Sequence, residues 1–118
     1  DSSMKQQISK CGKFTTHLEG ASVLIVIVQP SSAREFDAGR CAQNMMLAAW
    51  SDGIVSCPAT MHEHQCALRT LKVPSDYMVS IVIAFGYPQS NEQEDEMPAG
   101  LSHRRRMPIS KLVHYEVW

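Results

Sequence analysis

Two uninterrupted apolar segments constrain the possible folds of this chain more than any other feature. The first reads SVLIVIV over Ser22–Val28, and the second reads YMVSIVIAFG over Tyr77–Gly86. Runs of β-branched residues without polar alternation are typical of strands that are covered on both faces. We therefore expect both segments to form buried strands.

The sequence outside these strands predicts three helices. Residues 2–12 predict a short helix with Gly12 as its C′ residue. A longer helix is expected from Ala38, with Asp37 as its N-cap and Gly53 as its stop signal. A further helix is expected over Glu63–Lys72, before a Val-Pro pair.

The C-terminal segment KLVHYEVW alternates apolar and polar residues. This alternation predicts an extended strand over Lys111–Trp118. The order helix, strand, helix, helix, strand and extended tail predicts an α+β fold with layered elements. The length of 118 residues suits a single domain, residues 1–118.

Composition and motifs exclude several classes of protein. The net charge of −1 gives no electrostatic reason to expect nucleic acid or an anionic membrane as a partner. The longest apolar run, Ala21–Val28, is too short to span a bilayer, and no signal-peptide pattern opens the chain. The sequence contains no dinucleotide-binding glycine motif, P-loop or nucleophile elbow. We therefore predict a cytoplasmic protein.

The chain has four cysteines: Cys11, Cys41, Cys57 and Cys66. A chain that can bury a sizeable core and has no secretory signal does not need a disulfide framework, so we expect free thiols. We expect Cys57 to be a small buried thiol rather than a redox group.

The segment CPATMHEHQC raises the hypothesis of a metal site made by Cys57, His62, His64 and Cys66. Its spacing, C-x4-H-x-H-x-C, differs from the paired spacings of zinc modules. On a helix, His62 and Cys66 share a face and His64 points away from it. We therefore predict no metal, and a metal-dependent module is the third of our hypotheses.

Five segments, in their order along the chain, resemble the C-terminal part of the nitroreductase family of FMN-dependent oxidoreductases. The family shows an Asp-x-Gly helix start, an L-A-A-x-x-x-G helix end, a loop with a small polar residue, a strand ending in G-Y-P, and a basic cluster before a proline. The matching residues are Asp37 and Gly39, Leu47–Gly53, Ser56–Met61, Gly86–Pro88 and Arg104–Pro108. The resemblance runs from about Leu18 to the end of the chain.

This resemblance implies a nitroreductase-like fold, with a mixed or antiparallel sheet flanked by helices. It implies an enzyme that passes hydride from NAD(P)H through FMN to a nitroaromatic or quinone acceptor in a ping-pong reaction. It further implies a homodimer whose active site is shared between the two chains. Trp50, Met45 and Met46 are then expected in the core or at the dimer interface.

The resemblance also implies two sets of FMN-binding residues. The backbone of Pro58, Ala59, Thr60 and Met61 is expected to pass the flavin ring and to donate an N–H to N5 or O4. Fixed N–H dipoles stabilise the charge that reduction places on a flavin without having to reorganise.

The second set is Arg104 and Arg106 in the cluster RRRMP, which matches the family's positions for the FMN phosphate. In an extended segment these two side chains point the same way and Arg105 points elsewhere. The guanidinium fork suits a phosphate dianion. The alternative is a solvated basic loop that balances nearby acidic residues. These acidic residues are Glu92, Glu94, Asp95 and Glu96.

The sequence departs from the family at its start. Family members begin with a basic R-S-x-R-like segment that contributes further cofactor contacts, and DSSMKQQISKCG enters the pattern after it. The chain is therefore either a piece of a longer protein or a short form without the family's N-terminal segment. The second case gives an alternative function, a flavin-free half domain that acts as a structural or regulatory dimerisation module.

Overall fold

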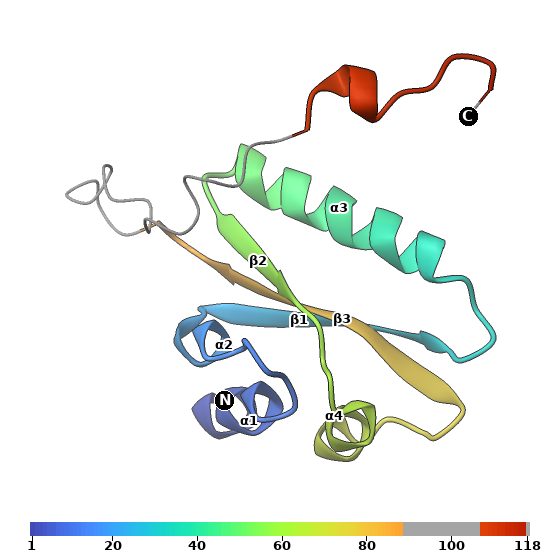
Figure 1. Ribbon diagram of the computed structural model, residues 1–118. Helices are drawn as coiled ribbons and strands as arrows, with labels where there is room; N and C mark the ends of the chain where they lie inside the picture. The colour runs from blue at the N-terminus through green and yellow to red at the C-terminus, as the bar shows by residue number, and fades with distance from the viewer. Residues whose placement is uncertain (89–106, 118) are drawn as a thin grey trace. The chain divides into compact units, whose positions relative to one another are not determined.

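Residues 1–88 fold around a three-stranded antiparallel sheet with the strand order β1-β3-β2 (Figure 1). The strands are β1 (Val23–Pro30), β2 (Val55–Ala59) and β3 (Tyr77–Gly86). This computed structural model describes residues 1–88 and 107–117. The chain divides into two units, Asp1–Pro88 and Gln89–Trp118, and each is described by itself. A single domain over 1–118 stays a prediction.

Helices lie on both faces of the sheet (Figure 1). The long helix α3 (Glu35–Ser51) covers one face. The helices α1 (Ser2–Ser9), α2 (His17–Gly20) and α4 (His64–Leu71) lie on the other. The chain therefore has an α+β fold with an antiparallel sheet between helices, as predicted.

The central strand β3 is buried on both faces, as its sequence predicts. Ile83 and Phe85 pack with residues of α3, whereas Val82 and Ala84 belong to the core under α1 and α4. The register against β1 shifts at Ser80, so that Val79 points to the same face as Val82. One extra residue on one strand is the usual form of a β-bulge.

The prediction that Ser22–Val28 is covered on both faces is wrong. Its strand, β1, lies at one edge of the sheet, and Val23 and Ile25 are exposed within the described part of the chain. The reason is that α3 contacts β2 and β3 more extensively than β1. An apolar run shows that a segment is suited to burial, but it does not show which helix covers it.

The segment Ser56–Met61 was expected as a loop, and it begins instead as strand β2, which pairs with β3. The long helix also begins earlier than predicted, with Arg34 rather than Asp37 at its N-cap. Asp37 lies in the first turn, where a carboxylate interacts favourably with the helix dipole.

The end of α3 follows the prediction. Gly53 adopts a left-handed conformation with φ +73°, and the N–H of Ile54 donates to the carbonyl of Ala49 at 2.9 Å. This is the backbone geometry in which glycine closes a helix without a Cβ penalty. The helix expected over Glu63–Lys72 is confirmed as α4, with Lys72 in the left-handed conformation at its C-cap.

Within 107–117 the structure has one short 3₁₀ helix, η1 (Ile109–Lys111). The described residues after it form no strand, so the extended strand predicted over Lys111–Trp118 is wrong for this part. Glu116 has φ +67°, which interrupts an extended course.

Candidate functional site

The four residues predicted to pass the flavin ring lie at and beyond the end of β2. Pro58 and Ala59 are the last residues of the strand, and Thr60 and Met61 follow it. The side chains of Ala59 and Met61 are buried in the core under α1 and α4, whereas Pro58 and Thr60 are exposed. The core therefore fixes this segment through alternate residues and leaves Pro58 and Thr60 exposed.

Pro58 shows how the backbone of this segment is oriented. Proline has no N–H, so it fits an edge strand only where its nitrogen faces away from the neighbouring strand, here β3. Within residues 1–88 and 107–117, no acceptor takes the N–H of the exposed residue Thr60. This main-chain donor is thus left for water or for a ligand, whereas Met61 is only 1% exposed.

The residues that follow, Thr60–Glu63, form what we call the β2–α4 loop. This loop is tied to the turn after α1. The N–H of Glu63 donates to the carbonyl oxygen of Cys11 at 2.9 Å, and the N–H of Lys13 donates to Nδ1 of His62 at 3.2 Å. The ring of Phe14 meets the His62 ring edge-on, with 6.4 Å between the centroids. No sequence signal indicated these contacts, because they join residues about fifty positions apart.

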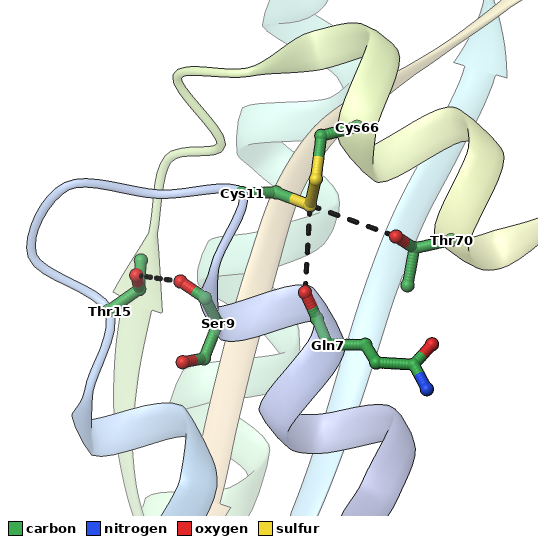
Figure 2. Close-up of a disulfide and its surroundings, with 6 residues drawn as sticks. All are labelled: Gln7, Ser9, Cys11, Thr15, Cys66 and Thr70. Atoms are coloured by element: carbon green, nitrogen blue, oxygen red, sulfur yellow. Dashed lines mark hydrogen bonds between the residues drawn. A yellow bond between two sulfur atoms is a disulfide. The ribbon is translucent and has the colours of Figure 1, made fainter.

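A disulfide joins Cys11 to Cys66, and Figure 2 shows it between the turn after α1 and the first turns of α4. The expectation of free thiols is therefore wrong for this pair. The layer of helices brings the two Cα atoms to 5.5 Å although 55 positions separate them, and spacing alone does not reveal such a contact.

The other two cysteines, Cys41 and Cys57, are free and exposed. The prediction of a buried Cys57 thiol is wrong because this residue lies on an edge strand, outside both core clusters. The cytoplasmic location rested partly on free thiols, and it stays a prediction.

The geometry contradicts the metal-site hypothesis. The sulfur of Cys66 is bonded to Cys11, and Nδ1 of His62 accepts a main-chain N–H. In the parts of the chain that the structure describes, no three His, Cys, Asp or Glu side chains are grouped so that they could hold a metal ion.

The predicted phosphate ligands Arg104 and Arg106 lie outside the described residues, as does Arg105. Their role stays a prediction.

Two of the cavities in the described part of the chain lie beside the sheet, and neither is lined by residues 58–61. One of about 220 Å³ lies beside the start of β2, between Ser56, Phe85 and His17. The other, of about 410 Å³, lies between α1 and β1. Pockets that enclose a drug-sized ligand measure roughly 300–1,000 Å³. The larger of these two cavities is within this range.

The outer face of α3, defined by Phe36, Leu47 and Trp50, is apolar and exposed. The side chain of Trp50 is 69% exposed, which excludes the core position among the two expected for it. The guanidinium of Arg40 lies 5.8 Å from the centroid of the Phe36 ring. Exposed Arg40 and Gln43 lie between Phe36 and Leu47 on this face, whereas Leu47 and Trp50 are one helical turn apart. Neighbouring exposed apolar side chains are typical of protein–protein contact sites.

The comparisons with known proteins agree with the resemblance seen in the sequence. The family model of the nitroreductase family matches residues 2–87. The chain belongs to the nitroreductase family. This nitroreductase family member thus has its matched region almost entirely in the unit that carries the sheet.

Solved structures show the same fold. An FMN-dependent nitroreductase from Clostridium difficile superposes with a TM-score of 0.78 at 23% identity, covering 100% of this chain and 72% of that one. Nitroreductase A from Vibrio parahaemolyticus superposes with a TM-score of 0.79 at 20% identity. The match covers 100% of this chain and 55% of that one. An NADPH:FMN oxidoreductase from Vibrio harveyi, complexed with NAD⁺, superposes with a TM-score of 0.77 at 18% identity. The match covers 100% of this chain and 56% of that one.

A search of curated proteins gives no match to this chain. Among the helices in residues 1–88 and 107–117, none has the length and apolar composition needed to cross a membrane.

Proposed function

We propose that this chain is part of an FMN-dependent oxidoreductase that passes hydride from NAD(P)H to nitroaromatic or quinone-type acceptors. Membership of the nitroreductase family supports the class of chemistry. The observation that carries the proposal is the main-chain N–H of the exposed residue Thr60, which no described residue accepts. The family resemblance implies a flavin ring beside this segment.

The residues present fit an electron-rich ring edge. When bound, FMN supplies the hydride-accepting ring, and NAD(P)H and the acceptor occupy its face in turn. The chain contributes a fixed donor: buried Ala59 and Met61 hold the backbone still, so its N–H dipole needs no reorganisation as charge develops. The described residues are not required to donate a proton as a general acid.

Arg104 and Arg106 are proposed to bind the FMN phosphate, with Arg105 as the internal control. We predict that Arg104→Ala or Arg106→Ala raises the Kd for FMN about 10-fold or more, because a charge-assisted hydrogen bond contributes about 1.5–3 kcal/mol. Arg105→Ala is expected to change Kd by less than about 3-fold. Fluorescence titration of FMN measures all three. Equal losses would indicate general electrostatics instead of a phosphate site.

A second copy of this chain is the proposed partner, docked on the outer face of α3. Phe36, Leu47 and Trp50 are exposed there, and residues 58–61 line neither cavity described above. A homodimer would cover the apolar face and supply the missing wall of the flavin site. Both features also fit the second candidate function, a flavin-free half domain that dimerises.

The absorption spectrum of the purified chain, recorded after FMN is added and the mixture is desalted, separates the two candidates. The oxidoreductase predicts flavin bands that survive desalting and bleach when NADH or NADPH is added without oxygen. A colourless dimer would contradict it and favour the half domain.

A further inference from the structure

Several contacts join the turn after α1 to the β2–α4 loop and to the first turn of α4. Cys11 is bonded to Cys66, its carbonyl oxygen accepts the N–H of Glu63, and the next turn residue, Lys13, donates to His62. All of these connections lie within six positions of Thr60 and Met61. The turn after α1 therefore helps to hold this loop in place, together with the buried side chain of Met61.

The two cysteines differ in exposure. Cys11 is 0% exposed, whereas Cys66 is partly exposed. Of the two, Cys66 is therefore the one that an attacking thiolate can approach from solvent, with Cys11 as the departing group. Sγ of Cys11 lies 3.7 Å from the carbonyl oxygen of Gln7 and 3.8 Å from Oγ1 of Thr70 (Figure 2). After reduction, these oxygens are acceptors for the Cys11 thiol, so the core accommodates both redox states.

We propose that Cys11 and Cys66 form a redox-sensitive clamp on the β2–α4 loop, closed as the disulfide and open as the dithiol. The reductant is a dithiol. Its first thiolate bonds to Sγ of Cys66, the Cys11–Cys66 bond breaks, and Cys11 leaves as a thiolate that takes up a proton. Its second thiolate then displaces Cys66, which is also protonated. Two electrons pass to the protein, and the reductant departs as a disulfide.

Opening the clamp removes the covalent link that holds the turn after α1 against α4. The hydrogen bonds from Glu63 to Cys11 and from Lys13 to His62 then depend on packing alone. Thr60 and Met61 lie in the same loop, so the clamp would regulate flavin binding; this consequence rests on the proposed function. The effect on loop mobility does not.

The test uses the full chain carrying Cys41→Ser and Cys57→Ser, so that only the buried pair can react. Backbone ¹⁵N relaxation is measured on the oxidised protein and after reduction with dithiothreitol under native conditions. In the reduced form we expect the order parameters of Thr60–Glu63 and Lys13 to fall from about 0.85 to below about 0.6. Those of the β3 amides should stay near about 0.85.

Order parameters report on the folded state, so a change in overall stability does not alter them. Loop values that do not change on reduction would overturn the clamp, as would an equal fall in β3. A disulfide that dithiothreitol reduces only in denaturant would also overturn it. Cys11→Ser with Cys66→Ser is a permanently open form and should reproduce the reduced spectrum; if it does not fold, the reduced chain itself decides.

The Kd for FMN is then measured for the oxidised and reduced chain. We expect reduction to raise it at least 10-fold. An unchanged Kd together with a mobile loop would overturn the link to the flavin and leave the clamp standing. Failure to bind FMN in either state would contradict the proposed function, and the relaxation result would still decide the clamp.

Discussion

The two faces of the sheet are closed in different ways. Under α1, α2 and α4 the core contains large side chains that are fully buried, such as Ile8, Leu18 and Met61, and the disulfide crosses it. Over the other face, the buried residues of α3 are only Ala38 and Ala42, which are 5% and 8% exposed, and Trp50 on its outer side is exposed. The chain thus completes one face with its own residues, whereas the outer face of α3 has an apolar surface that a partner would cover.

This difference matters for function because the predicted flavin segment, Pro58–Met61, is related to both faces of the sheet. Ala59 and Met61 are fixed by the closed face. Ala59 is the last residue of the edge strand β2, which α3 also contacts. The closed face positions the main-chain donor of Thr60, and we propose that a partner docked on α3 supplies the enclosure.

The largest expected effect is on the closed face, at the disulfide. Cys11→Ser with Cys66→Ser should lower the free energy of unfolding by about 4 kcal/mol, because the bond closes a loop across 55 positions. Urea denaturation measures this loss. The matched pair Cys41→Ser with Cys57→Ser should change it by less than about 1 kcal/mol, since both thiols are exposed. Similar losses in the two pairs would contradict the comparison.

A smaller loss is expected when one buried side chain is truncated on the same face. Leu18→Ala should cost about 3 kcal/mol, because the residue is 0% exposed and the change leaves a cavity. Leu47→Ala on the outer face of α3, where the leucine is 58% exposed, should cost less than about 1 kcal/mol in the monomer. Denaturation at low protein concentration compares them, and equal values would show that α3 is covered.

For the outer face of α3, the quantity to measure is the dissociation constant of the homodimer rather than the free energy of unfolding. Trp50→Ala should raise the dissociation constant of the homodimer about 10- to 100-fold, since buried tryptophans are frequent hot spots of interfaces. Met4→Ala, an exposed apolar residue on α1, should leave it unchanged. Analytical ultracentrifugation measures both. A wild-type chain that stays monomeric at high concentration would remove the proposed interface.

The smallest effect is expected at the end of α3. Gly53→Ala should cost about 1 kcal/mol, because φ is +73° although the space around its Cβ position is open. Gly39→Ala is the matched control inside the same helix, also in open space, and should stabilise by up to about 1 kcal/mol. The melting temperatures of the two variants, measured by thermal denaturation, should therefore change in opposite directions from that of the wild type.

Local signals predicted the elements whose cause is local. The β-branched run of β3, the glycine that ends α3 and the proline after α4 each act within a few residues, and the structure has the corresponding strand and helix ends. The family resemblance supplied the overall fold in the same way, through short segments in a fixed order.

What the sequence did not predict depends on contacts between distant residues. The pairing of β2 with β3, the exposed edge of β1 and the bond between Cys11 and Cys66 each require the folded layers. The candidate site shows the same division. The role of Pro58–Met61 beside a flavin is implied by the family pattern and stays a prediction, whereas no sequence signal indicated the anchoring of the β2–α4 loop to the turn after α1.

Native mass spectrometry of the chain with FMN tests the central claim most directly, because it counts chains and flavins in the same particle. We expect the wild-type chain to form a dimer that carries two FMN molecules. We expect the Trp50→Ala variant to be a monomer without bound FMN. A monomer that binds FMN fully, or a dimer that binds none, would contradict the claim that a second copy completes the flavin site.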